Sequence, residues 1–381
     1  MRTGGVWSSV FDHLTSFAGL DVCRYNAAGW VVKAFYRGVE IFSRTDDKYS
    51  MTIDSVQTTD EQSAALELLR GARRVLLTGH EAPDGDCIGA QTAMSRMLRS
   101  MGKEVWILNP DPVESKYSYL TEHCDFGVYK GADLPVHDLA CLLDGGELER
   151  TGRLAAPLAR AASKKIVVDH HVTTSAPWAD GAFTDVKASA TGLLVWRIAE
   201  ALGVELDQIA CEGVFTSIVT DTGWFKYSNT DAETLRVCSQ LAERGVSPSE
   251  LFAKIYQRRG PGYPVHVGRV LEGVVYHAEG RLAVVTVPMD DVSSGQVEMH
   301  DILDVLGSVG NVEVVLLLRE TGHGQCKLSA RSKTAFDVSE LARRFGGGGH
   351  ARASGARLKG TLVEAQADIV GAVLEALEVT L

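Results

Sequence analysis

Short apolar segments alternate with amphipathic helical segments from about residue 72 onward, and this alternation restricts the fold more than any other feature of the chain. The apolar segments have the length and composition of strands that are buried on both faces of a parallel sheet. They are Arg74–Thr78, Val105–Leu108, Leu139–Leu143 and Ile166–Val168. The predicted helices are Gly89–Met101 and, roughly, residues 188–202, 207–219, 231–244 and 248–257. We therefore predict an α/β domain with a doubly wound, mostly parallel sheet.

The order of elements changes after a stretch rich in glycine and proline, Arg258–Pro264, which we interpret as a linker. Beyond it, strands are predicted at 281–288, 312–318 and 325–331, with helices near 337–344 and 362–378. This order predicts a smaller α+β domain. The predicted divisions are an N-terminal extension over 1–58, the first domain over 59–257, the linker over 258–264 and the second domain over 265–381.

The first 50 residues differ from the rest of the chain. They are rich in aromatic residues, and neither helical nor strand periodicity persists in them for long. From Met51 the sequence resembles an ordinary amino terminus, with Thr59–Gln62 as a helix start. We interpret the segment before it as an accessory or mis-assigned upstream extension.

Charge and cysteine content exclude several classes of protein. The formal net charge of -11 argues against a uniformly basic protein that coats long nucleic acid. The seven cysteines form no CxxC pair, so neither a disulfide framework nor a zinc–thiolate site is expected. No apolar run approaches the roughly 18 residues that span a bilayer, and no secretory signal is visible. We expect a cytoplasmic protein with no membrane partner.

Aspartate and histidine residues gather at four places in the first domain, three of them directly after predicted strands. The four places are GHEAPDGDCIGA with His80, Asp84 and Asp86; CLLD ending in Asp144; VVDHH with Asp169, His170 and His171; and DTGWFKYSNT opening with Asp221. Ligands of an open parallel sheet bind at the carboxyl ends of its strands, so the first three places are expected to converge in one crevice.

Carboxylates gathered in one crevice repel one another unless cations neutralise them. Two divalent ions would balance four negative charges. Four carboxylates are available in the crevice, those of Asp84, Asp86, Asp144 and Asp221. Mixed imidazole and carboxylate ligands suit manganese, and could also hold iron or cobalt. Two metal ions about 3.5–4 Å apart can activate a bridging hydroxide and clamp a phosphate.

Each of these places has a simpler interpretation when it is taken alone. A single aspartate after a strand is usually a helix cap, PDGD is a common turn, and a single histidine at a strand end is usually a hydrogen-bonded structural residue. The metal site is favoured because four such places recur in order within one domain.

The end of the second domain is basic and glycine-rich. Between Arg319 and Lys359 nine lysines and arginines face three acidic residues, a local balance of +6. Within it, FGGGGHARASG (Phe345–Gly355) could bring backbone N–H groups close to an anion, with His350 as a polar contact. Arg331 could clamp a phosphate through two hydrogen bonds. The glycines alone could equally be a flexible connector.

Together these motifs resemble the DHH phosphoesterase superfamily over residues 60 to 378. The resemblance rests on HxxPDGDxxGA, the strand-end Asp144, the Asp169–His171 triplet, DTGxFxxxNT and a carboxyl-terminal DHH-associated domain with GGGGHxxASG. Similarity is greatest to the short two-domain bacterial members of the NrnA type, which are oligoribonucleases and 3'-phosphoadenosine 5'-phosphate (pAp) phosphatases.

The resemblance implies a role for each site residue. His171 would face the scissile phosphate and either stabilise it or protonate the leaving oxygen, and Asp169 would orient the imidazoles. The implied manganese ligands are His80, Asp84 and Asp144 for one ion, and Asp86, Asp144, His170 and Asp221 for the other. The implied substrate-binding residues are Ser329, Arg331, Gly347, Gly348, Gly349 and His350.

The implied activity is two-manganese hydrolysis, in a cleft between the domains, of short oligoribonucleotides (nano-RNA) to mononucleotides and of pAp to AMP. The partners would be short RNA or small nucleotides and not long nucleic acid. Alternatives are a cyclic-di-AMP or pApA phosphodiesterase, a RecJ-like single-strand exonuclease, a manganese pyrophosphatase or exopolyphosphatase, and a non-catalytic nucleotide sensor. The sequence leaves open the preferred substrate, the direction of degradation, the metal used in the cell and the oligomeric state, a homodimer included.

Overall fold

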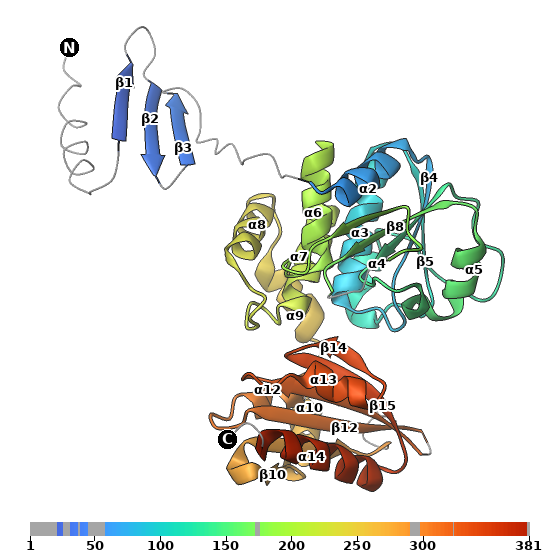
Figure 1. The fold of residues 1–381 in the computed structure, drawn as a ribbon, viewed down its shortest axis with the longest axis vertical. Coiled ribbons are helices and arrows are strands. Elements are labelled where there is room, and N and C mark those ends of the chain that lie inside the picture. Colours follow the sequence, from blue (N-terminus) through green and yellow to red (C-terminus); the bar gives the residue numbers. More distant parts are fainter. Residues whose placement is uncertain are drawn as a thin grey trace. The chain divides into compact units, whose positions relative to one another are not determined.

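The computed structural model describes residues 21–25, 31–36, 39–44, 58–171, 176–289, 298–322 and 324–378 (Figure 1). The chain divides into two compact units, Met1–Thr58 and Thr59–Leu381. In the first unit, β1 (Asp21–Tyr25), β2 (Val31–Tyr36) and β3 (Val39–Arg44) form an antiparallel sheet. Sequence periodicity did not predict these short strands. Most of residues 1–58 lie outside the described residues, and their interpretation as an extension stays a prediction.

The larger unit begins with a six-stranded sheet in the order β6-β5-β4-β7-β8-β9, in which every neighbouring pair is parallel. Its strands are β4 (Arg74–Thr78), β5 (Glu104–Asn109), β6 (Phe126–Val128), β7 (Leu139–Leu143), β8 (Lys164–Asp169) and β9 (Gly181–Thr184). The predicted parallel α/β sheet is confirmed. β6 and β9 were not predicted, because each is only three or four residues long.

Helices cover both faces of this sheet, and alternate strand residues enter two separate cores. On one face Leu77, Cys141 and Val168 pack against α3, α6 and α7, and on the other Leu76 and Ala140 pack against α5. The helices are α2 (Asp60–Gly71), α3 (Gly85–Ser100), α4 (Ser118–Thr121), α5 (Ala155–Arg160), α6 (Thr191–Leu202), α7 (Gln208–Asp221), α8 (Ala232–Glu243) and α9 (Pro248–Tyr256).

Helix α3 begins four residues before the predicted start at Gly89. The Asp84 side chain caps it by accepting hydrogen bonds from the backbone N–H groups of Asp86 and Cys87. The PDGD sequence is therefore a helix start, and Asp86 lies buried in the first helical turn. The predicted start of α2 is confirmed, since Thr59 and Gln62 form a reciprocal capping box.

The backbones of α3 and α7 approach each other closely at Gly89 and Gly213. A Cβ atom on Gly89 would lie 2.4 Å from the Gly213 carbonyl oxygen and 2.7 Å from the Ser217 nitrogen. The absence of a side chain at Gly89 therefore allows the start of α3 to lie close to the middle of α7.

We expect Gly89→Ala to destabilise the protein by roughly 1–3 kcal/mol, because the methyl group meets backbone that must move. The midpoint of urea unfolding, followed by circular dichroism, measures the effect. Gly371→Ala is the matched control, since Gly371 lies on an exposed face of a helix with no atom within 4 Å of its Cβ position. That variant should be neutral or slightly stabilising. Equal midpoints for the two variants would show that the α3–α7 contact tolerates a methyl group.

The predicted linker 258–264 stays a prediction, and its last two residues are helical. Tyr263 and Pro264 form the first turn of α10 (Tyr263–Glu272), where proline costs no hydrogen bond. The second sheet follows in the order β10-β11-β12-β13-β15-β14, with helices on both faces. Its strands are β10 (Val275–His277), β11 (Leu282–Val287), β12 (Val314–Gly322), β13 (Gln325–Ser332), β14 (Gly348–His350) and β15 (Ala353–Lys359). The helices are α12 (Met299–Gly307), α13 (Val338–Arg344) and α14 (Leu362–Glu378).

The sheet of the second domain is mixed, since β11 pairs with β12 in parallel and the remaining pairs are antiparallel. The predicted smaller α+β domain is confirmed. In the part of the chain that the structure describes, no helix is both long enough and apolar enough to cross a bilayer.

Candidate active site

The carboxyl ends of three neighbouring parallel strands bring the predicted Asp and His residues together. His80 follows β4, Asp144 follows β7, and Asp169 ends β8 directly before His170 and His171. The start of α3 adds Asp84 and Asp86, and the last residue of α7 is Asp221. The expected convergence is therefore present, and Asp221 joins it from a helix.

Asp144 lies between two groups of side chains. In the first group, His80 Nε2 lies 3.3 Å from Asp144 Oδ2 and 3.9 Å from Asp84 Oδ1. The buried Cys87 thiol belongs to the same group, because its Sγ lies within 4.8 Å of ligand atoms of His80 and Asp144. Burial and the charge of Asp144 raise the pKa of this thiol well above its usual value, so it stays neutral.

In the second group, His170 Nε2 lies 3.2 Å from Asp86 Oδ2, 3.8 Å from Asp221 Oδ2 and 3.9 Å from Asp144 Oδ1. The carboxylate of Asp144 thus contacts both groups through different oxygens. All six predicted metal ligands lie in one or the other group.

Asp144 has a strained backbone that the sequence did not reveal. Its φ of 61° lies in the left-handed region, which costs a non-glycine residue on the order of 1 kcal/mol or more. Its N–H donates to the Val168 carbonyl, and its Oδ1 accepts from the Thr191 hydroxyl. These contacts hold the carboxylate between the two groups of ligands, and backbone strain of this kind is common at functional sites.

Asp86 is oriented by groups that sequence reasoning missed. Its two carboxylate oxygens accept hydrogen bonds from the Thr191 N–H, the Gly192 N–H and the Ser217 hydroxyl. The sequence gives one weak signal for the hydrogen bonds from Thr191 and Gly192. A run of small residues comes before Thr191, and such residues are frequent where a helix starts. Asn229, within the DTGWFKYSNT motif, donates to Asp221 Oδ2 at 3.1 Å.

The carboxylates and imidazoles perturb one another strongly. Burial and the charges of Asp86 and Asp144 raise the pKa of Asp221 to about 8, although His170 opposes this rise. Burial would lower the pKa of His80, but its hydrogen bond to Asp144 and the nearby carboxylates raise it to about 9. Without another cation, this site therefore takes up protons to balance its negative charge.

The donor atoms fit divalent metal ions. His80 Nδ1 donates to the Glu81 carbonyl at 2.8 Å, and His170 Nδ1 donates to the Ala188 carbonyl at 3.0 Å. Both rings thereby direct Nε2 at the carboxylates, the arrangement seen when a histidine binds a metal through Nε2. His170 Nε2 is buried and faces carboxylate oxygens of Asp86 and Asp221, and none of the described residues gives it a hydrogen bond of good geometry, as is expected of a nitrogen that coordinates an ion.

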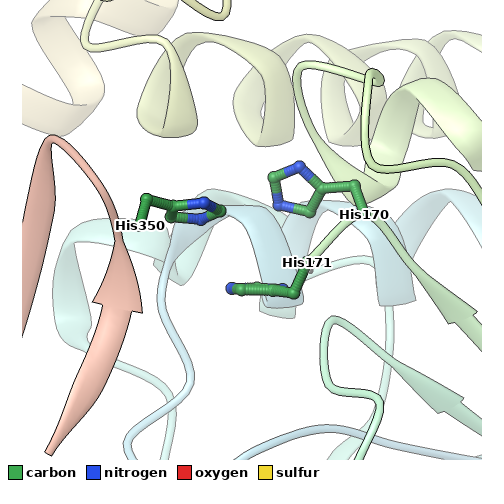
Figure 2. Close-up of side chains that lie close together, drawn as sticks. All are labelled: His170, His171 and His350. Atoms are coloured by element: carbon green, nitrogen blue, oxygen red, sulfur yellow. The ribbon is translucent and has the colours of Figure 1, made fainter. Parts of the chain in front are cut away.

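His171 belongs to a third arrangement, with Asp169 and a histidine of the second domain. Its Nδ1 lies 2.7 Å from Asp169 Oδ1, and its ring stacks on the His350 ring with the centroids 4.8 Å apart. Figure 2 shows the His350 ring beside those of His170 and His171. Burial and the charges of His171 and His170 lower the pKa of His350 to about 4, so His350 is neutral.

The predicted Gly346–His350 loop is in part a strand, since Gly348–His350 form the edge strand β14. Two positions of this segment require glycine. A Cβ atom on Gly347 would lie 2.1 Å from the Gly355 carbonyl oxygen, and Gly349 has a φ of +136°, which other residues rarely adopt. Arg331 and Ser329 lie on β13, and Arg331 shares a cross-strand row with His350 through Ala353.

Two family models match the chain. The DHH family, N-terminal domain model matches residues 74–218, and the DHHA1 domain model matches residues 280–378. The first match contains the three strand ends, and the second contains the glycine-rich segment.

Two related proteins and one solved structure cover most of the chain. The bifunctional oligoribonuclease and PAP phosphatase NrnA of Thermus thermophilus is 32% identical over 293 residues, which are 75% of this chain and 84% of that protein. The Bacillus subtilis protein of the same name is 27% identical, over 74% of this chain and 89% of that protein. The crystal structure of an exopolyphosphatase-related protein from Bacteroides fragilis has a TM-score of 0.77 at 24% identity, over 85% of this chain and 98% of that chain, which shows the fold.

Proposed function

Because the chain belongs to the DHH family and is a phosphoesterase, we propose that it hydrolyses short oligoribonucleotides to mononucleotides and 3'-phosphoadenosine 5'-phosphate to AMP with the help of two divalent metal ions. The observation that carries the metal-dependent reaction is the central position of Asp144, whose two oxygens face two separate groups of imidazole and carboxylate ligands. The similarity to the two NrnA proteins supports the substrates.

The residues of the two groups would divide the ions between them. Asp144 would contact both ions, with His80 and Asp84 completing one set and Asp86, His170 and Asp221 the other. Bound metal ions would supply a hydroxide at neutral pH and neutralise charge on the phosphate. Manganese is the metal we propose, because mixed nitrogen and oxygen ligands suit it.

His171 would act on the leaving group. Burial lowers the pKa of His171, but the hydrogen bond from its ring to Asp169 and the charge of Asp144 raise it above its usual value, which favours the protonated form of the ring. The hydrogen bond to Asp169 occupies Nδ1 and leaves Nε2 for the substrate. A positioned, protonated imidazole can donate its proton to the departing oxygen.

The second domain would hold the rest of the substrate. Arg331 can form two hydrogen bonds with a phosphate, and the glycines of the Gly347–Gly349 segment allow its backbone to approach an anion. Ser329 and His350 would add polar contacts. We propose that long nucleic acid is not a substrate and that the enzyme acts in the cytoplasm, consistent with the net charge of -11.

A substrate panel tests this proposal. The protein is freed of metal with EDTA, reloaded with manganese, magnesium or zinc, and assayed with a five-nucleotide RNA, pAp, pApA, cyclic-di-AMP and pyrophosphate. We expect activity on the RNA and pAp only after a metal is restored, with manganese most effective. Full activity in the metal-free protein would contradict the role of the ions. Exclusive hydrolysis of cyclic-di-AMP or of pyrophosphate would contradict the proposed substrates.

A further inference from the structure

Helices α10 and α12 cover β11 and most of β12 on one face of the second sheet, and the rest of that face, over β13, β15 and β14, carries a regular arrangement of polar residues. Along β13, Cys326, Leu328 and Ala330 enter the core beneath α13 and α14. Side chains alternate along a strand, so Lys327, Ser329 and Arg331 point to the opposite face. This is the face that also bears His350, because His350, Ala353 and Arg331 are directly opposed across β14, β15 and β13.

Three cross-strand rows follow one another on this face. The first is His350–Ala353–Arg331, the second is Gly348–Gly355–Ser329, and the third is Arg357–Lys327–Arg319. Only the third row continues with a polar residue on β12, because the β12 partners of the first two, Val315 and Leu317, are buried in the core beneath α10 and α12. The second row contains two glycines and one serine, so its side chains project very little above the sheet. A flat strip therefore separates two rows that carry cationic side chains.

The third row places three cations directly opposite one another. Like charges in opposed positions destabilise a sheet. Among the described residues, none of Arg319, Lys327 and Arg357 forms an ion pair, whereas the nearby Glu114 is paired with Lys116 at 2.8 Å. Desolvation and the charges of Arg319 and Arg357 lower the pKa of Lys327 below its usual value. The charge of Glu114 offsets only part of this repulsion, since the pKa of Lys327 is still lowered. Three opposed cations without an ion pair of their own are unfavourable for the stability of a sheet, and such exceptions are expected at functional sites.

The distance between the rows suits a substrate with several phosphates. The first row lies at the reaction site, where His350 stacks on His171. Lys327 and Arg331 are four positions apart along β13, so the third row lies roughly 13 Å from the first. The flat second row leaves space between them for a nucleoside.

We infer that Arg319, Lys327 and Arg357 bind backbone phosphates of an oligonucleotide beyond the one held at Arg331, and that this row distinguishes oligonucleotides from pAp. The inference rests on the proposed function. pAp has two phosphate groups, and when one is at the reaction site the other is within reach of the first row only. An oligonucleotide of three or more residues has further phosphates that extend toward the third row.

The test compares the two substrates in one variant. The triple variant Arg319→Gln, Lys327→Gln, Arg357→Gln is assayed with a five-nucleotide RNA and with pAp. We expect the ratio of kcat/KM for RNA to that for pAp to fall at least about tenfold, through the KM for RNA, because each phosphate contact contributes to binding. The dependence of RNA binding on salt should also become less steep. The control variant Lys333→Gln, Arg343→Gln, Arg344→Gln removes the same charge from exposed positions outside the three rows and should keep the ratio.

Several outcomes would overturn the inference. They are an unchanged ratio in the triple variant, an equal loss with both substrates, or an equal change in the control. If the triple variant does not fold, as judged by circular dichroism, Lys327→Gln alone is measured by the same ratio. If the wild-type protein hydrolyses neither substrate, the proposed function fails. The row is then tested by fluorescence anisotropy with a labelled five-nucleotide RNA, where equal affinity of wild-type and variant would overturn it.

Discussion

Replacing Asp144 with asparagine should abolish phosphoesterase activity while leaving the fold intact. The Asp144 carboxylate contacts both groups of ligands, so its loss would weaken both metal sites at once. We expect kcat to fall by roughly 10³-fold or more, since metal ions contribute several kcal/mol to charge stabilisation in such reactions. The measurement is manganese-dependent turnover of pAp, together with the metal content of the purified variant.

Asparagine is the informative substitution because of the backbone at this position. Asn tolerates the left-handed conformation that Asp144 adopts, whereas Ala does not. We therefore expect Asp144→Asn to unfold near the wild-type temperature and Asp144→Ala to unfold at a lower one. Wild-type turnover and two bound metal ions in Asp144→Asn would rule out the shared-ligand arrangement.

Replacing His171 with alanine should slow hydrolysis of nucleotide substrates by roughly 10²–10⁴-fold, the contribution of a general acid. If His171 protonates the leaving oxygen, the loss depends on the leaving group. A nucleoside hydroxyl needs the proton, whereas p-nitrophenolate departs without it. We expect the variant to retain most activity toward the p-nitrophenyl ester of thymidine 5'-monophosphate.

His350→Ala is the matched control for this experiment, because His350 stacks on His171 but its low pKa keeps it neutral. The loss of activity in His350→Ala should be similar for substrates with either leaving group. An equally large loss with both esters in His171→Ala would instead indicate that His171 stabilises the phosphate and does not act as an acid.

Much of the fold followed from local patterns. Arg74–Thr78 and Leu139–Leu143 were predicted with their observed ends, since buried parallel strands are short and continuously apolar. The errors have two different causes. The start of α3 was missed because its local cap, Asp84, lies in a PDGD sequence that resembles a turn. Two of the four glycines that resemble a flexible connector, Gly348 and Gly349, form an edge strand because β15, a separate segment, offers them partners.

The residues of the site, like the fold, could be predicted only in part from the sequence. Asp84, Asp86, Asp144 and His170 could be placed together because strand ends of a parallel sheet converge, whatever the details of packing. Asp221, at the end of a helix, was included through the resemblance of its DTGWFKYSNT motif. The hydrogen bonds of Thr191 and Ser217 to Asp86 could not be identified, since those residues come from helices 105 and 131 positions away along the chain. No local pattern specifies such distances.

The sequence by itself determined which Asp and His side chains are candidates for the site, the order in which they occur and the parallel sheet that gathers most of them. Those features depend on residue type and on periodicity over a few positions. Only the tertiary structure decided the left-handed backbone of Asp144, the stacking of His350 on His171 and the alignment of three cations across β12, β13 and β15. Strand register and close helix packing, as at Gly89 and Gly213, set these positions, and both arise from contacts between segments that are distant in the chain.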